Sequence, residues 1–129
     1  MNYLLDTHLL LWASNDSPKL PPSAAAIIAE SENTVWVSVV SLWEVAIKRT
    51  PSRQNFSYEV GPLREGLLAN GYEELNMEAR HVLALRALPV LHSDPFDRLL
   101  VAQAISEGMT FLTADRKLAD YGTYVRVVY

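Results

Sequence analysis

The chain has 129 residues, which is enough for one domain with its own hydrophobic core. It contains no cysteine, so disulfides and zinc sites built on thiolates are excluded, and half of its residues are hydrophobic, as in an ordinary globular protein. The net charge of −4 argues against a simple nucleic-acid coat protein, which would bind phosphates through lysine and arginine, but it is compatible with a nuclease that holds cations on carboxylates.

The N-terminal segment has no feature of a targeting or membrane sequence. Residues 1–6 lack a basic region ahead of the apolar run and lack a small-residue cleavage site. The run Tyr3–Trp12 is interrupted by Asp6 and His8 and is too short to cross a bilayer. We therefore expect a cytoplasmic protein that has no membrane partner.

In the first half of the chain, β-branched and aromatic runs predict strands, and runs rich in leucine and alanine predict helices. The predicted elements are a strand over Asn2–Leu5, a helix over Thr7–Ala13, a helix over Ala24–Glu30 after Leu20-Pro21-Pro22-Ser23, a strand over Val35–Ser38 and a helix over Leu42–Arg49. Ser41 is expected to cap the last of these helices. Thr50–Phe56 contains Pro51 and several polar residues, which predicts a loop.

The second half continues the alternation. The predicted elements are a helix over Tyr58–Ala69, a turn at Asn70-Gly71, a short strand over Tyr72–Leu75, a helix over Met77–Ala87, a connection over Pro89–Asp94, a helix over Pro95–Glu107 ended by Gly108, a strand over Thr110–Thr113, a short helix over Arg116–Tyr121 and a strand over Tyr124–Tyr129. No repeat or dividing linker is visible, so we expect a single domain over residues 1–129. Alternating strands and helices predict an α/β fold of three layers, α/β/α, with a mainly parallel central sheet.

Acidic residues follow the predicted strands. Asp6 and Asp115 come just after two of them, and Glu44 lies in the first turn of the helix that follows a third. In open α/β sheets, ligands bind beyond the carboxyl ends of the strands. Asp97 can reach the same edge if the helix that begins near Pro95 starts there. The four carboxylates Asp6, Glu44, Asp97 and Asp115 are therefore predicted to meet in one pocket.

A purely structural interpretation exists for each acid. Asp6, Asp94 and Asp115 precede helices, where aspartate is a favoured cap, and Asp97 would complement the helix dipole. Taken together, the acids weaken this interpretation. Glu44 and Asp97 have mostly apolar neighbours, and an acid in such a context is costly unless it is paired or bound to a metal.

Four motif blocks carry a family resemblance. They are Leu4-Leu5-Asp6-Thr7-His8, Ser41-Leu42-Trp43-Glu44-Val45-Ala46-Ile47-Lys48, the segment from His92 to Ala104 that includes Asp94-Pro95-Phe96-Asp97-Arg98, and Leu112-Thr113-Ala114-Asp115. In this order they cover nearly the whole chain, and together they resemble the PIN-domain ribonucleases, specifically the VapC-type toxins of VapBC toxin–antitoxin pairs.

The resemblance implies a metal-dependent RNA endonuclease. Asp6, Glu44, Asp97 and Asp115 match the family's acidic quartet, which holds Mg²⁺ or Mn²⁺ while water attacks the phosphodiester and leaves 5′-phosphate and 3′-hydroxyl ends. Thr7 and Thr113 match hydroxyl positions that help to orient metal or water. For Asp94, a helix cap and a secondary site role both stay open. The resemblance also implies a homodimer and a cognate VapB-like antitoxin, and the apolar helix faces near Trp12, Trp43 and Tyr58 suggest partner surfaces.

Several basic residues and histidines are further candidates for the site. Lys48, Arg49, Arg98 and Arg116 are candidate RNA contacts, although exposed basic side chains are more often plain solvated surface. His8 and His92 suggest a general base or a zinc ligand, but scattered histidines without ligand spacing favour a structural interpretation. After Lys48 the chain departs from the subgroup's Leu-Gly-Lys-Leu-like segment, which puts the local substrate or partner surface in doubt.

Two other functions remain as alternatives. An aspartate-nucleophile phosphatase also has an apolar strand that ends in aspartate, but it requires a second aspartate two residues on, where this chain has His8. A non-catalytic PIN-like module that only binds RNA or a partner is the second alternative. The intact quartet argues against it, and an RNA cleavage assay with manganese would distinguish such a module from a nuclease.

Overall fold

The computed structural model describes residues 1–48 and 59–129. Five strands form one sheet in the order β3-β2-β1-β4-β5, and every neighbouring pair is parallel. The elements are β1 (Asn2–Leu5), α1 (Thr7–Ser14), α2 (Pro22–Ala29), β2 (Thr34–Ser38), α3 (Val39–Lys48), α4 (Val60–Ala69), β3 (Glu73–Leu75), α5 (Ala79–Ala87), α6 (Pro95–Glu107), β4 (Thr110–Thr113), the 3₁₀ helix η2 (Arg116–Tyr121) and β5 (Val125–Val127).

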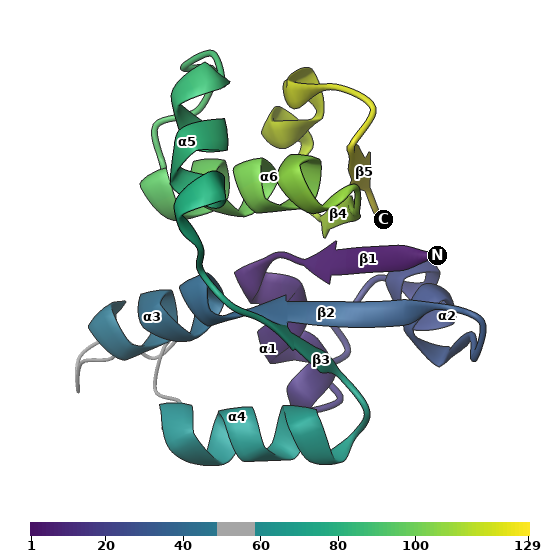
Figure 1. The fold of residues 1–129 in the computed structure, drawn as a ribbon. Helices are drawn as coiled ribbons and strands as arrows, with labels where there is room; N and C mark the ends of the chain where they lie inside the picture. The colour runs from purple at the N-terminus through teal and green to yellow at the C-terminus, as the bar shows by residue number, and fades with distance from the viewer. Residues whose placement is uncertain (49–58) are drawn as a thin grey trace.

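Helices cover both faces of the sheet (Figure 1). On one face, α1, α2 and α4 pack a core that includes Leu9, Ala24 and Leu67. On the other, α5, α6 and η2 pack a second core that includes Leu100 and Leu118. Neighbouring strand residues contribute to opposite cores, because side chains alternate across a strand. This confirms the predicted three-layer α/β architecture, in which the sheet is entirely parallel.

Strand β1 lies at the centre of the sheet, and its position determines where the acids meet. From β1 the chain continues to β2 on one side, whereas β4 lies on the other side. Crevices open at the carboxyl end of a sheet where the strand order reverses in this way. Asp6 follows β1 directly, so it stands at this switch point, between the ends of β2 and β4.

The start of helix α3 differs from its prediction in a way that moves a site residue. Helix α3 begins at Val39, so the prediction that Ser41 caps it is wrong. The Ser38 hydroxyl instead accepts a hydrogen bond from Val40 N at 3.0 Å, and Ser41 is fully buried inside the helix. Glu44 is therefore the sixth residue of α3, one turn further along than predicted.

Most other predicted elements are present, with ends shifted by a few residues. Helix α5 begins at Ala79 rather than at Met77, and β5 is limited to Val125–Val127. Helix α6 spans the predicted residues, and Gly108 ends it in the left-handed conformation with φ 69°. The predictions for Arg49, Thr50–Phe56 and Tyr58 fall outside the described residues. Among the described helices, none has the length and apolar character that a bilayer crossing requires.

Candidate functional site

Asp6 is the central acid of the site. It is buried, it caps α1 by accepting a hydrogen bond from Leu9 N on Oδ1 at 2.7 Å, and its Oδ2 accepts one from the Thr113 hydroxyl at 2.5 Å. Burial raises the pKa of the Asp6 carboxyl, and the bond from Thr113 opposes that shift only in part. Asp6 is thus fixed at both oxygens, in surroundings that disfavour its negative charge.

Glu44 reaches the same place from α3. Its side chain is buried, and Oε1 accepts a hydrogen bond of 2.6 Å from the hydroxyl of Thr7, the residue that follows Asp6. The Thr7 hydroxyl also lies 3.0 Å from that of Ser41. Lys48, one turn further along α3, pairs with Glu44 Oε2 at 2.6 Å. These contacts hold Glu44 against the start of α1.

Asp97 lies in the first turn of α6, and Asp94 caps that helix. Asp94 Oδ1 accepts hydrogen bonds from Phe96 N and Asp97 N, at 2.8 and 3.2 Å. Burial raises the pKa of Asp97 to about 7, and repulsion from the carboxylates of Asp94, Asp6, Glu44 and Asp115 adds to the effect. The four predicted acids are therefore close enough in space to act on one another electrostatically.

Asp115 completes the set after β4. Its backbone N–H donates to the Thr113 hydroxyl at 3.0 Å, and its Oδ1 caps η2 by accepting a hydrogen bond from Lys117 N at 3.0 Å. Oδ2 lies 3.3 Å from His92 Nε2. Ligand atoms of His92, Asp97 and Asp115 all lie within 4.8 Å of one another.

The donor set at this edge suits a hard divalent cation. It consists mainly of carboxylate and hydroxyl oxygens, which Mg²⁺ and Mn²⁺ prefer. Burial is the main reason that the pKa of Asp97 rises to about 7, and the four neighbouring carboxylates raise it further, because a negative charge there is repelled. Lys48 pairs with Glu44 and lies 3.9 Å from Asp94. Within the described residues, no lysine or arginine pairs with Asp6, Asp97 or Asp115.

Comparison with known proteins places the sequence in a family. The family model of the PIN domain matches residues 3–123, nearly the whole chain. The chain belongs to the PIN domain family. Among curated proteins, a search with the sequence finds no match.

Two solved structures share the fold of this PIN domain. One is VapBC2 from Rickettsia felis bound to a DNA fragment from its promoter, with 19% identity, a TM-score of 0.73 and 100% coverage of both chains. The other is VapBC-1 from nontypeable Haemophilus influenzae, with 16% identity, a TM-score of 0.62 and 98% coverage of each chain. At identities this low, the likeness establishes a common fold.

The candidate RNA contacts of the PIN domain lie in different surroundings. Lys48 stands beside the acids, as described above. The Arg98 Nε is buried and has no hydrogen-bond partner among the described residues. Arg116 is exposed and stacks on the Tyr129 ring, with 4.8 Å between its guanidinium and the ring centroid. Arg49 falls outside the described residues.

Two polar residues of the site were missed or undervalued from the sequence. Ser41 was assigned to a helix cap, yet it lies buried beside Thr7. His92 was given a structural interpretation, yet its ring lies beside Asp115 and 4.0 Å from Asp97. The sequence signal for His92 is its place at the start of the motif block from His92 to Ala104, which does not fix where a side chain in a connection points.

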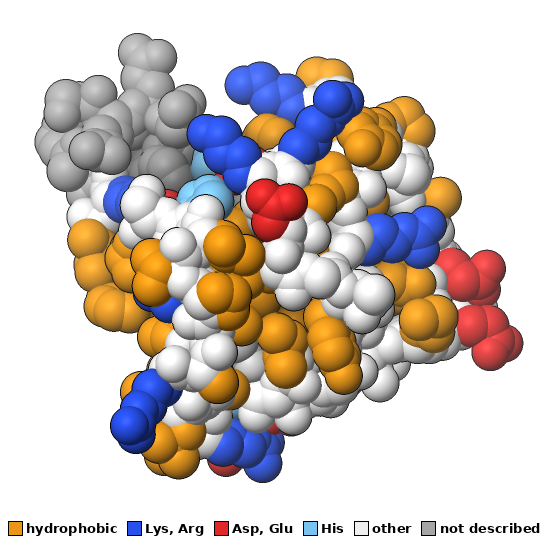
Figure 2. Space-filling view, turned by 90° about the horizontal axis from the view of Figure 1, so that it is seen from above, with side chains coloured by type: hydrophobic (Ala, Val, Ile, Leu, Met, Phe, Trp, Pro, Cys, Tyr) orange, Lys and Arg blue, Asp and Glu red, His pale blue; other side chains and the backbone are white. Residues whose placement is uncertain are grey.

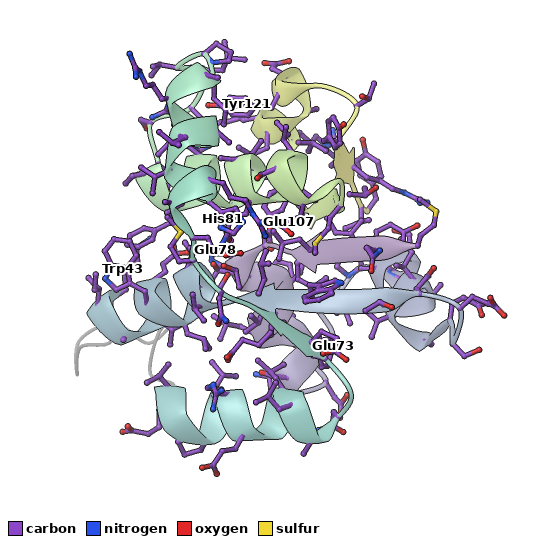
Figure 3. All side chains as sticks on the ribbon, viewed as in Figure 1. Trp43, Glu73, Glu78, His81, Glu107 and Tyr121 are labelled. Carbon is purple, nitrogen blue, oxygen red and sulfur yellow. The ribbon has the colours of Figure 1, made fainter. Side chains whose placement is uncertain are left out.

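A second cluster of histidine and carboxylates lies away from the acidic edge, where the start of α5 meets the end of α6 (Figure 3). It consists of Glu78, His81 and Glu107. The buried His81 ring accepts a hydrogen bond from Glu78 N on Nδ1 at 3.0 Å and donates from Nε2 to Glu107 at 2.8 Å. Arg80 pairs with both glutamates at 2.7 Å. Both ring nitrogens are engaged and a guanidinium already supplies positive charge, so this cluster is structural.

The surface of the PIN domain has other candidate binding features. A cavity of about 630 Å³ lies between the end of α1 and α4, and its lining includes Asp16, Leu63 and Tyr72 but none of the four acids. On α3, Trp43 and Ile47 are more than half exposed. Seen from above, the face over α5 and η2 carries scattered hydrophobic side chains with lysine and arginine between them (Figure 2). Exposed hydrophobic residues on α5 and in the connection after it include Leu83 and Val90.

Proposed function

We propose that this PIN domain is a Mg²⁺- or Mn²⁺-dependent endoribonuclease that acts as the toxin of a type II toxin–antitoxin pair, and that residues 1–129 form a single domain. The observation that carries the proposal is the group of four carboxylates, far apart in the sequence, at the carboxyl edge of a parallel sheet. The pKa of Asp97, raised to about 7, supports a site that is incomplete without added positive charge. PIN domains are generally nucleases, which supports this class of activity.

Asp6, Glu44, Asp97 and Asp115 are the residues that would hold the cation. Bound there, a divalent cation supplies charge that neutralises a phosphate and lowers the pKa of an attacking water. Thr113 holds Asp6, and Thr7 holds Glu44, so these carboxylates are oriented in advance. Asp94 keeps α6 capped and so holds Asp97 in the first turn of that helix, which assigns it a positioning role. The reaction proposed is in-line attack of water on a phosphodiester.

RNA is the proposed substrate, and basic side chains near the acids would contact its phosphates. Lys48 is the best placed of the candidates, because its ammonium already lies among the carboxylates. Arg98 lies in the first turn of α6, Arg116 begins η2, and Arg49 follows Lys48 in the sequence. Each of these side chains carries a positive charge that an RNA backbone would attract.

A VapB-like antitoxin is the proposed partner, and a homodimer in the cytoplasm is the proposed form of the protein. The two similar structures are described as VapBC complexes, and one of them holds a promoter fragment, which supports a toxin–antitoxin setting. The exposed Trp43 and Ile47 of α3, the helix that carries Glu44, offer an apolar surface for an antitoxin segment. The negative charge beside it favours a basic side chain on that segment.

The test is RNA cleavage by the full chain and by Asp6→Asn. Asparagine keeps an oxygen that can cap α1, so the variant is expected to fold while cleavage in Mn²⁺ falls by more than about 100-fold, beyond the 10–100-fold typical for residues that only support metal ligands. The control is Asp120→Asn, which removes an exposed acid of η2 and should cut RNA like the wild type. EDTA should silence the wild type. Cleavage by folded Asp6→Asn at the wild-type rate, or undiminished cleavage in EDTA, would overturn the proposal.

The same assay distinguishes the proposed nuclease from the non-catalytic alternative. A module that only binds RNA or a partner would leave a labelled RNA intact in Mn²⁺, and Asp6→Asn would then change nothing. A gel-shift measurement with the same RNA would detect binding without cleavage.

A further inference from the structure

The side chain of His92 stands at the acidic edge although it belongs to the connection between α5 and α6. It is 14% exposed, and its two ring nitrogens face different groups. Nδ1 lies 3.2 Å from the backbone nitrogen of Asp94, and Nε2 lies 3.3 Å from Asp115 Oδ2. The ring therefore connects the start of α6 to the acid that follows β4.

These contacts determine which ring nitrogen carries the proton. A backbone N–H can only donate, so His92 Nδ1 must accept from Asp94. The neutral imidazole then carries its proton on Nε2, which makes Nε2 a donor to Asp115. A cation on Nε2 would have to displace this proton and break the bond to Asp94 as well.

Tyr121 fixes the backbone that carries His92. Its hydroxyl accepts hydrogen bonds from Leu91 N at 3.3 Å and from His92 N at 3.1 Å. Tyr121 belongs to η2, the same short helix that Asp115 caps. The donor ring of His92 and the acceptor Asp115 are thus attached to one element and keep their relative position.

Asp115 is the most exposed acid of the quartet. Its side chain is 41% exposed, whereas Asp6 and Glu44 are buried with hydroxyl partners. We propose that His92 is a positioning residue that fixes Asp115 by donating from Nε2 to Oδ2, and that it is not itself a metal ligand. Because Lys117 N already donates a hydrogen bond to Oδ1, both oxygens of Asp115 are then held. The inference rests on the proposed function, in which Asp115 binds a cation.

Mn²⁺ titration of the full chain, followed by the electron paramagnetic resonance of the free ion, tests the proposal. The side-chain amide of glutamine reaches about as far as Nε2, whereas that of asparagine reaches only to the place of Nδ1. We expect His92→Asn to weaken Mn²⁺ binding by roughly 10–100-fold, as is typical when a partner of a metal ligand is lost. His92→Gln should stay within about threefold of the wild type by keeping a donor. The control Ser93→Ala alters the same connection at an exposed position and should bind like the wild type.

Pulsed resonance of the Mn²⁺-loaded protein provides the readout that distinguishes positioning from ligation. We expect no modulation from a directly coordinated nitrogen in the wild type. A nitrogen signal that disappears in His92→Gln would overturn the proposal, and so would equal losses of affinity in both variants or no loss in either. If the wild type binds Mn²⁺ normally in those cases, the proposed function stands without this inference. If the wild type binds no Mn²⁺, the metal mechanism fails and the inference fails with it.

Discussion

The molecule contains two histidine–carboxylate pairs with nearly the same local geometry and opposite electrostatics. In each, Nδ1 accepts a backbone N–H and Nε2 faces a carboxylate: His81 faces Glu107, and His92 faces Asp115. At the first pair, the hydrogen bond from His81 and the nearby Arg80 guanidinium hold the pKa of Glu107 below its ordinary value. At the second, burial and then repulsion from the nearby carboxylates raise the pKa of the neighbouring Asp97 to about 7.

The difference shows that residue types alone do not define a metal site. Both clusters have a histidine and two acids within reach of one ion. The cluster around His81 already contains its own cation, the Arg80 guanidinium. This cluster stabilises the contact between α5 and α6. The other lies where strands end and gathers more acids than the nearby cations neutralise. An excess of unneutralised charge, rather than the list of ligands, is the useful criterion.

The largest stability effect should come from the structural pair. His81→Leu removes the acceptor for Glu78 N–H and the donor to Glu107, and it leaves the buried Gln103 amide without its contact at 3.2 Å. Unsatisfied buried polar groups cost about 1–3 kcal/mol each, so we expect a loss of about 3 kcal/mol in urea unfolding. His81→Asn, which keeps an acceptor, should lose less. Mn²⁺ affinity should be unchanged in folded protein, and loss of Mn²⁺ binding there would contradict the contrast between the two pairs.

A smaller change in the free energy of unfolding, this time an increase, is expected from a substitution at the acidic edge. The Asp97 carboxyl has a pKa of about 7 in the folded protein against an ordinary value of 3.8. Between these values the folded state keeps a proton that the unfolded chain has lost, so the metal-free protein should lose stability as the pH rises from about 4 to about 7. Asp97→Asn should flatten this slope and stabilise the protein at pH 8 by about 1 kcal/mol after solvent screening, a few degrees in Tm. Thermal unfolding from pH 4 to pH 8 checks this, and identical slopes in both proteins would contradict it.

The smallest change in stability should follow from Arg80→Ala. The arginine is 57% exposed, and pairs of this kind contribute less than about 1 kcal/mol. Both nitrogens of His81 remain engaged after the change, so no second Mn²⁺ site should appear. Counting bound Mn²⁺ per chain measures this directly. One additional Mn²⁺ ion bound by Arg80→Ala would mean that the guanidinium blocks a second metal site in the wild type.

The acids that come within two residues of a strand end were the most predictable part of the site. Asp6 and Asp115 depend only on where a strand ends, which an apolar run reveals locally. Glu44 depends on where α3 begins, and that start is set by Ser38, whose hydroxyl also donates to Gln103, 65 residues away. No local pattern contains that contact, and the helix start was therefore placed three residues too late.

His92 was out of reach of the sequence for a similar reason. Its position depends on Tyr121, which lies about 30 residues further along and holds the connection by two backbone N–H groups. The layers and the parallel sheet could be predicted because periodicity and alternation are properties of the chain itself. Partners across the fold could not, because hydrogen bonds between distant residues leave no pattern in a single sequence.

The capping roles of the acids have a consequence for how the protein is assembled. Asp6, Asp94 and Asp115 each bond to a backbone N–H through Oδ1, and these bonds form together with the helices themselves. The edge is therefore arranged by the polypeptide before any ion arrives, unlike in small domains that fold only around their metal. The metal-free chain should accordingly remain folded, so that loading with a cation becomes a separate, reversible step.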